Sequence, residues 1–409
     1  MNQDNAVSCD IFCAVVDNYG DIGVCWRLSR QLADEFGVVV RLWVDDLASF
    51  RKLSRQIDPG LSVQYLYGVE IRLWSQSFEE IQSFEEAQSF EEIRPAQIVI
   101  EAFACKLPQC YVEAMAKMEH KPFWVNLEYL SAETWVQGCH GLPSPHPRLP
   151  LVKYFFFPGF SGGTGGLLLE KDLFTRRDRF VADPAQQIQY WEMLGVSPRM
   201  PGETRVSLFC YENPAVAALL TAWMSGTQLT TCLIPEGRIL PQVAAFFGRA
   251  ALSAGDVLQQ GNLRVHVLPL VEQDEYDKLL WACDINFVRG EDSFVRAQWA
   301  AKPFIWHIYP QQDGVHMKKL DAMLDLYCKG LQPQCALDVK TLWRRWNTGV
   351  DPEFDALNIS AKHWNDFLLH QPVLLQYAVS WARQLDANNL ALNLLDFSRK
   401  VGRIAPFEI

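Results

Sequence analysis

Near the start of the chain stands the stretch Asp17–Gly23, which reads DNYGDIG and decides how the first domain is interpreted. It follows an apolar run at 11–16, typical of a buried strand, and precedes a segment at 24–32 whose apolar spacing predicts a helix. A glycine-bearing turn between a first strand and a first helix normally binds an anion, because the helix N-terminus presents N–H groups. The two carboxylates in this turn would repel a phosphate. The stretch therefore predicts a site for a cationic or proton-losing group.

The two acids of this turn, Asp17 and Asp21, have two interpretations. In one, Asp21 or Asn18 caps the helix and Asp17 closes the turn. A cap needs only one side chain, however, and carboxylates this close raise one another's pKa values. A pair of that kind suits a general base or a clamp on a cation.

Length and composition set the class of protein. A chain of 409 residues predicts two domains, and a hydrophobic content of 49% with 21% charged residues is typical of a soluble globular protein. The net charge of −11 argues against a nucleic-acid partner. No apolar run reaches the length of a membrane span and no signal peptide is present, so we expect a cytoplasmic protein without a membrane partner. The 11 scattered cysteines favour reduced thiols.

Strand and helix signals alternate in both halves of the chain, which predicts two parallel α/β sheets followed by terminal helices. Between the halves, a stretch rich in Gly, Pro and aromatic residues at 138–166 indicates an interdomain connection or a mobile loop. A six-residue repeat within Ser77–Ile93 is interpreted as a local duplication at the surface. The strands are expected at 10–16, 38–44, 62–66, 97–102 and 122–126, then at 205–211, 229–234, 264–268, 285–288 and 304–306.

A second strand–glycine–helix turn lies in the second half, at Arg289–Ser293. The N–H groups of the helix that begins there, with Arg289 and the hydroxyl of Ser293, could bind a diphosphate. Glu291 could accept hydrogen bonds from a sugar hydroxyl. The alternative is an ordinary capped helix with surface charges.

Aromatic residues near the ends of the second-half strands form a third group. Tyr211 follows one predicted strand, and Tyr276 begins the helix after another. Two such rings could stack on a nucleobase, each contributing about 0.5–1.5 kcal/mol beyond area burial. Packing in the core is the alternative, and it is favoured for Phe209. No Asp-x-Asp pair or histidine cluster suggests a metal site.

Four motifs together resemble the EarP family, bacterial protein-arginine rhamnosyltransferases that act on translation elongation factor P. They lie at 17–28, 42–47, 211–213 and 289–293, and the resemblance spans nearly the whole chain except the repeat. It implies a GT-B fold, with two facing Rossmann-like domains and C-terminal helices that return to the first. We expect an acceptor-binding domain at 1–180, a nucleotide-sugar-binding domain at 181–375, and returning helices at 376–409.

The resemblance also implies inverting transfer of L-rhamnose from dTDP-β-L-rhamnose to one arginine of the factor, without a metal or other cofactor. It assigns the general base to Asp21, with Asp17 and Glu291 as further catalytic residues. Of the donor-binding residues, Arg289, Glu291, Asp292 and Ser293 fall on the family's donor motif. Tyr211 and Tyr276 are our own placements of the rings that stack on the thymine. We expect Gln273 and Gly23 to contribute to donor binding as well.

Two other functions remain open. A nicotinamide-dependent oxidoreductase is supported by Asp45 and Asp46, which follow the second strand where a ribose-binding acid would lie. Against it, the first turn lacks the Gly-x-Gly-x-x-Gly pattern. A noncatalytic protein that binds a translation factor is the other alternative.

Overall fold

The structure, a computed structural model, describes residues 6–16, 19–74, 94–348 and 359–402. The predicted acid Asp17 and the repeat Ser77–Ile93 lie outside these residues. The chain divides into two compact units: unit 1 comprises residues 1–171 and 385–409, and unit 2 comprises residues 172–384. The limits expected from the sequence, 180 and 376, lie a short distance from these boundaries.

Unit 1 is built on an eight-stranded sheet with the order β3-β4-β2-β1-β5-β6-β8-β7. Pairing is parallel from β4 through to β8, and the edge strands β3 and β7 pair antiparallel with their neighbours. The elements of unit 1 are β1 (Ser8–Cys13), α1 (Gly20–Phe36), β2 (Val39–Val44), α2 (Leu47–Leu53), β3 (Val63–Leu66), β4 (Val69–Leu73), β5 (Ile98–Ala102), α4 (Gln109–Lys117), β6 (Phe123–Leu127), α5 (Val136–Cys139), β7 (Pro143–Pro145), β8 (Val152–Phe156) and α16 (Leu390–Lys400).

The central strands of unit 1 are buried on both faces, which explains their nearly continuous apolar sequences. Ile11 of β1 pairs with Leu42 of β2 on one side and with Ile100 of β5 on the other, and all three are fully buried. After β1 the chain adds β2 and β4 on one side of β1, and it then adds β5, β6 and β8 on the other side, so β1 is the topological switch point of the sheet. In sheets of this kind the ligand site lies beyond the carboxyl ends of the strands at such a switch point.

The glycine-rich stretch at 138–166 is regular in part, so the expectation of a connection or loop without regular structure is wrong. It contributes β7 and β8 to the sheet, and its end packs against the returning C-terminus. Gly166 has φ +81°, and a Cβ there would lie 2.1 Å from the backbone oxygen of Asn388. The backbone N–H of Leu167 donates a hydrogen bond to the backbone oxygen of Asn388 at 3.0 Å, and the backbone oxygen of Leu167 accepts one from the N–H of Leu390 at 2.9 Å. Only glycine allows this approach.

Helix α16 completes unit 1. Asn389 caps the helix by accepting a hydrogen bond from the backbone N–H of Leu392 at 3.2 Å. Leu394 belongs to the same buried core as the central strands, and the ring of Phe397 contacts those of Phe123 and Tyr154. The expectation that C-terminal residues return to the first domain is thus confirmed for α16.

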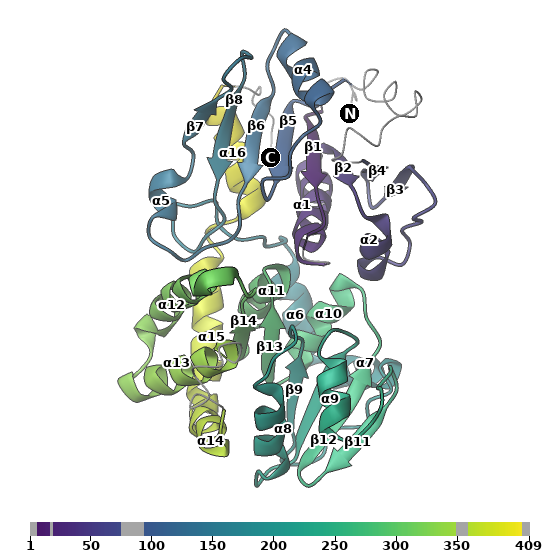
Figure 1. Cartoon of the computed structure of the whole chain (residues 1–409), viewed down its shortest axis with the longest axis vertical. Helices are drawn as coiled ribbons and strands as arrows, with labels where there is room; N and C mark the ends of the chain where they lie inside the picture. The colour runs from purple at the N-terminus through teal and green to yellow at the C-terminus, as the bar shows by residue number, and fades with distance from the viewer. Residues whose placement is uncertain (1–5, 17–18, 75–93, 349–358, 403–409) are drawn as a thin grey trace. The chain divides into compact units, whose positions relative to one another are not determined.

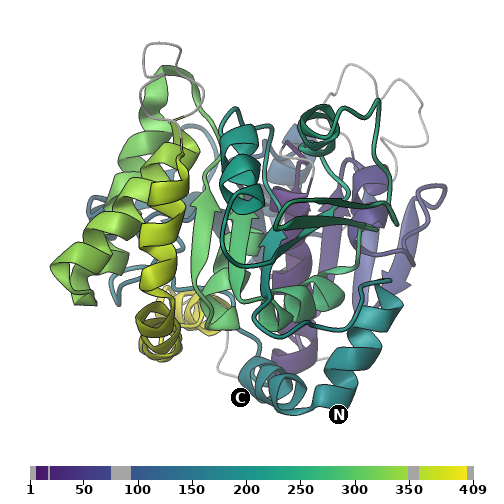
Figure 2. The same ribbon diagram turned by 90° about the horizontal axis from the view of Figure 1, so that it is seen from below.

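Unit 2 contains a six-stranded sheet with the order β11-β12-β10-β9-β13-β14, parallel except for the edge strand β11. Helix α13 packs against β14, and its neighbours α12 and α14 pack against α13 (Figure 1 and Figure 2). Its elements are α6 (Leu173–Ala182), α7 (Pro184–Met193), β9 (Thr204–Leu208), α8 (Val216–Met224), β10 (Thr230–Pro235), α9 (Leu240–Phe246), β11 (Val257–Gln260), β12 (Leu263–Leu268), α10 (Gln273–Ala282), β13 (Ile285–Arg289), α11 (Asp292–Ala300), β14 (Phe304–His307), η2 (Gln312–Gly314), α12 (Val315–Tyr327), η3 (Cys328–Gly330), α13 (Pro333–Asn347), α14 (Ala361–Leu369) and α15 (Gln371–Leu385).

Aromatic packing holds one face of this second sheet to its helices. The ring of Phe287, in the middle of β13, lies 5.9 Å from that of Trp223 on α8 and 5.0 Å from that of Trp346 on α13. All three residues are at most 1% exposed. Strand order in unit 2 reverses between β9 and β13. The carboxyl ends of these two strands are therefore where a ligand is expected.

Candidate functional site

The cationic residue of the predicted donor site, Arg289, ends β13 at this switch point. It is 6% exposed, and its guanidinium lies 4.3 Å from the ring centre of Phe209 and 4.8 Å from that of Tyr211. Its Nη1 donates a hydrogen bond to the backbone oxygen of Cys210 at 3.2 Å. The segment that follows β9 thus orients the positive charge at the end of β13 through cation–π contacts and one hydrogen bond.

The turn after Arg289 is closed by Ser293. The Ser293 hydroxyl accepts a hydrogen bond from the backbone N–H of Arg289 at 3.0 Å and donates one to the backbone oxygen of the same residue. Gly290 has φ +60°, and its backbone oxygen accepts a hydrogen bond from Trp306 Nε1 at 2.8 Å. The turn therefore starts α11 directly beside Arg289. The donor-binding role of the Ser293 hydroxyl stays a prediction.

Two further contacts fix the acidic residues of the motif. Asp292, the first residue of α11, accepts a hydrogen bond from Gln273 Nε2 at 3.1 Å. Glu291 lies 3.2 Å from Lys319 Nζ on α12 in a partly buried ion pair. The structure therefore brings Gln273, which begins α10, next to the motif after β13. Its role in donor binding stays a prediction.

The two predicted stacking residues take different positions. Tyr211 lies beyond the end of β9 and is only 4% exposed; its ring meets those of His307 and Tyr309 edge-on at 5.3 and 5.4 Å. Tyr276 is half-buried in the first turn of α10, with its ring 5.5 Å from that of Phe209. Burial raises the pKa of Tyr276, against smaller opposing effects of Ser293 and Arg289. Stacking on a base stays a prediction for both.

His307 also belongs to this group, although the sequence favoured a structural role for it and did not place it at the donor site. It pairs with Arg289 in the register of β14 with β13, and it is 2% exposed. Among the described residues its Nδ1 has no hydrogen-bond partner. Burial, with the neighbouring charges of Arg289 and His316, lowers the pKa of His307 to about 3. The imidazole is therefore neutral at neutral pH and leaves Arg289 as the cation of this group.

In unit 1, Asp21 lies at the other switch point, after β1. It stands in the first turn of α1 and is 3% exposed. Its Oδ2 accepts a hydrogen bond from the backbone N–H of Val16 at 3.1 Å. The N-cap residue of α1 is Tyr19, and within the described residues no side-chain capping hydrogen bond is made there. Gly23 belongs to the same turn and donates its N–H to the backbone oxygen of Tyr19 at 2.9 Å. Asp21 therefore holds the backbone between strand and helix. The alternative capping residue, Asn18, lies outside the described residues.

The acids that supported an oxidoreductase have structural contacts. Asp46 caps α2, because its Oδ1 accepts a hydrogen bond from the backbone N–H of Ser49 at 2.9 Å and its Oδ2 one from the hydroxyl at 2.5 Å. Asp45 Oδ1 accepts a hydrogen bond from the backbone N–H of Val15 at 2.8 Å. Asp45 and Asp21 thus hold successive N–H groups at the end of β1. These contacts disfavour a ribose-binding role for Asp45 and for Asp46.

A comparison with known families gives one match over nearly the whole chain. The family described as "Elongation-Factor P (EF-P) rhamnosyltransferase EarP" matches residues 9–399. The chain belongs to the EarP family. Two relatives named protein-arginine rhamnosyltransferase support this membership. One, from Pseudomonas putida, is 46% identical over 95% of this chain and 98% of its own length, and one from Pseudomonas aeruginosa is 49% identical over 84% and 87%.

Solved structures confirm the expected fold class. One described as the structural basis for EarP-mediated arginine glycosylation of translation elongation factor EF-P is 35% identical, covers 96% of this chain and 99% of its own, and has a TM-score of 0.65. A glycosyltransferase from Rickettsia africae, 9% identical over 97% of this chain and 99% of its own, has a TM-score of 0.54. The EarP-family chain has a GT-B fold, and the prediction that it is a glycosyltransferase is confirmed.

Neither a metal-ligand cluster nor a membrane-spanning helix occurs within the described residues of this EarP-family chain. In the part of the chain that the structure describes, no group of three or more metal-ligating side chains is found. No helix of the described residues combines the length and the apolar character needed to cross a membrane. The predicted independence from metal stays a prediction.

Proposed function

We propose that this EarP-family enzyme transfers L-rhamnose from dTDP-β-L-rhamnose to one arginine side chain of translation elongation factor P, with inversion at the anomeric carbon. The observation that carries the proposal is the group around Arg289. A buried arginine, held over two rings at the switch point of unit 2, stands beside the N-terminus of α11. Family membership adds the sugar and the amino acid that the relatives' names print.

The donor chemistry follows from this group. When the bond between the anomeric carbon and the phosphate oxygen breaks, both electrons leave with the diphosphate. Arg289 and the N–H groups that begin α11 offer that charge hydrogen bonds and a positive field. Glu291, oriented by Lys319, would accept hydrogen bonds from the sugar. The rings of Tyr211 and Tyr276 would contact the thymine base of the donor. The proposal includes no metal.

The acceptor chemistry assigns the general base to Asp21. A guanidinium has a pKa above about 12, so it stays charged until the new bond forms. A carboxylate can hold it, turn one nitrogen toward the anomeric carbon, and take the proton as the carbon–nitrogen bond forms. Inversion requires this base on the sugar face opposite the departing diphosphate. The proposal therefore requires Asp21 to reach the arginine while the donor is bound. Asp17 is the second acid of the proposed clamp.

The test is transfer by the purified chain. Incubation with dTDP-rhamnose and elongation factor P should add the mass of one deoxyhexose to the factor, and fragmentation should locate it on one arginine. A factor with lysine at that position is the control and should gain nothing. NMR of the product should show an anomeric configuration opposite to that of the donor. An unmodified factor would favour the noncatalytic alternative, and retention would exclude the proposed inversion.

A further inference from the structure

Helices α10 and α11 supply most of the proposed donor-binding residues of unit 2. Gln273 and Tyr276 lie in the first turn of α10, and Asp292 and Ser293 lie in the first turn of α11. Both helices follow parallel strands of one sheet, so they run in the same direction, and they pack side by side (Figure 1). The offset between the two helices therefore determines how these side chains are placed around one ligand.

Two contacts of equal spacing link the helices. The outer one joins Gln273 to Asp292, as described above. The inner one is an ion pair between Asp277 and Arg296, each four residues further along its own helix. Arg296 Nε lies 3.0 Å from Asp277 Oδ1, and Arg296 Nη2 lies 2.6 Å from Oδ2. Residues four apart lie on the same face of a helix, so the two contacts are successive links between the same two faces.

The inner contact is fully enclosed, with the side chain of Arg296 2% exposed and that of Asp277 1% exposed. Replacing a buried ion pair of this kind by apolar residues of similar size often leaves stability unchanged or raises it, so stability alone does not explain such a pair. Its two parallel hydrogen bonds restrict both the distance and the rotation between the groups. An apolar pair would fill the space without that restriction.

We propose that Asp277 and Arg296 are positioning residues, which set the offset of α10 against α11 and so align the donor-binding residues one turn away. The inference rests on the proposed function, because it assumes that dTDP-rhamnose binds at the start of these helices. Neither residue is assigned contact with the donor. Each acts through its helix on Gln273 and Asp292.

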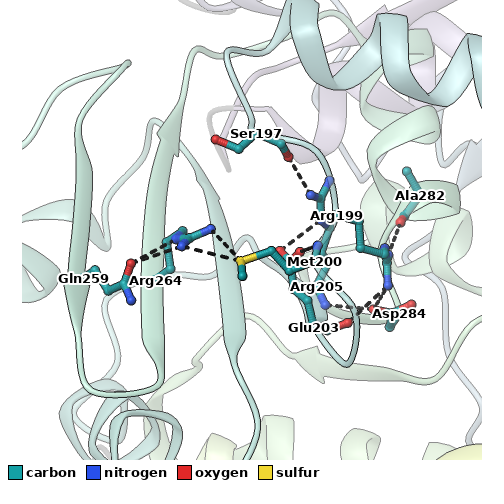
Figure 3. Close-up of polar contacts among 9 residues, drawn as sticks. All are labelled: Ser197, Arg199, Met200, Glu203, Arg205, Gln259, Arg264, Ala282 and Asp284. Atoms are coloured by element: carbon teal, nitrogen blue, oxygen red, sulfur yellow. Dashed lines mark hydrogen bonds and ion pairs between the residues drawn. The ribbon is translucent and has the colours of Figure 1, made fainter.

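A second buried ion pair in unit 2 provides a matched control. Arg205 Nε lies 3.1 Å from Glu203 Oε1, both side chains are 1% exposed, and Arg205 also donates to the backbone oxygen of Ser197 (Figure 3). The pair stands at the amino end of β9, whereas Arg289 stands at the carboxyl end of the parallel strand β13. This pair is as buried as the Asp277–Arg296 pair, but it lies at the amino ends of the parallel strands, away from the proposed donor site.

The experiment compares Asp277→Leu/Arg296→Met with Glu203→Leu/Arg205→Met in the full chain. Melting temperature, the KM for dTDP-rhamnose, the KM for the protein acceptor and kcat are measured for each. The first variant should keep its folded state and show at least a tenfold higher donor KM, with the acceptor KM unchanged. The control should keep the donor KM of the wild type. A structural role alone would lower the active fraction, and hence apparent kcat, in both variants without changing either KM.

A folded first variant whose donor KM stays within twofold of the wild type would overturn the inference. If that variant does not fold, Arg296→Lys decides, with Arg205→Lys as its control, because lysine keeps the charge and loses the paired hydrogen bonds. A raised donor KM for Arg296→Lys alone supports the inference, and an unchanged one overturns it. The wild type separates this result from the proposed function. If the wild type neither binds dTDP nor turns over dTDP-rhamnose, the proposed function fails first.

Discussion

Protonation of His307 should destabilise unit 2 at mildly acidic pH. The imidazole is 2% exposed, and burial with the charges of Arg289 and His316 lowers its pKa to about 3. In the unfolded chain an imidazole has a pKa of about 6.5. Between these two values the unfolded chain binds a proton that the folded chain does not. Stability is therefore complete above pH 6.5 and is lost as the pH falls toward 3.

The size of the effect follows from the two pKa values. A pH of 5 lies about 1.5 units below the pKa of the imidazole in the unfolded chain, whereas the imidazole in the folded chain is still neutral at that pH. Each unit corresponds to about 1.36 kcal/mol, so this single group should remove roughly 2 kcal/mol of unfolding free energy between pH 7.5 and pH 5. The figure holds for any folded pKa below about 4, since the folded imidazole stays neutral at pH 5.

The assay is urea unfolding of the wild type and of His307→Gln at pH 7.5 and pH 5, followed by tryptophan fluorescence. Trp346, whose ring lies 5.7 Å from that of His307, reports on this region. The wild type should lose about 2 kcal/mol more than the variant between the two pH values, because all other titrating groups are shared. His120→Gln removes an exposed imidazole and is the control. Equal losses in the wild type and His307→Gln would refute the reasoning.

Two further substitutions test the donor site and the packing of the C-terminus. Arg289→Ala should weaken dTDP binding by about 10- to 100-fold, since hydrogen bonds to a charged group contribute about 1.5–3 kcal/mol. Arg264→Ala, near the amino end of β12 in the same unit, is the control and should leave the dTDP affinity unchanged. Both affinities are measured by calorimetry. If Arg289→Ala bound dTDP as tightly as the wild type, the diphosphate would have to bind elsewhere. Gly166→Ala should cost roughly 2–4 kcal/mol in denaturant unfolding, because its Cβ would meet the backbone oxygen of Asn388 at a positive φ. Gly162→Ala, with nothing within 4 Å of its Cβ, should change stability by less than about 0.5 kcal/mol; equal effects would contradict the packing argument.

The sequence predicted the central strands well, because strands buried on both faces have nearly continuous apolar sequences. It missed two strands at one side of the first sheet and placed the end of a central strand of the second sheet too late. β7 is three residues long and β8 has the sequence VKYFF, so neither shows an alternation that separates it from the surrounding Gly-rich and Pro-rich sequence. The predicted strand at 205–211 ends early, at Leu208, and this leaves Phe209, Cys210 and Tyr211 to turn toward Arg289.

The candidate site was predictable where one motif holds its residues together. Arg289 and Ser293 lie in the same strand–glycine–helix turn, and the hydrogen bonds between them confirm that this turn is a local unit. The position of His307 beside Arg289 was not predicted, because it depends on the pairing of β13 with β14, which no local pattern indicates. Asp277 and Arg296 were missed for a similar reason, since their contact depends on the packing of two helices.

The central claim is that unit 1 supplies the general base, Asp21, and that unit 2 supplies the donor site. It is tested most directly by Asp21→Asn, because asparagine can still accept the hydrogen bond from the backbone of Val16 while it loses the ability to take a proton. Rhamnose transfer and dTDP affinity are measured on the same preparation. Transfer should fall by about 10²–10⁴, the usual contribution of a general base, with dTDP affinity within about twofold of the wild type. Unchanged transfer, or a loss of dTDP affinity that matches the loss of transfer, would contradict the claim.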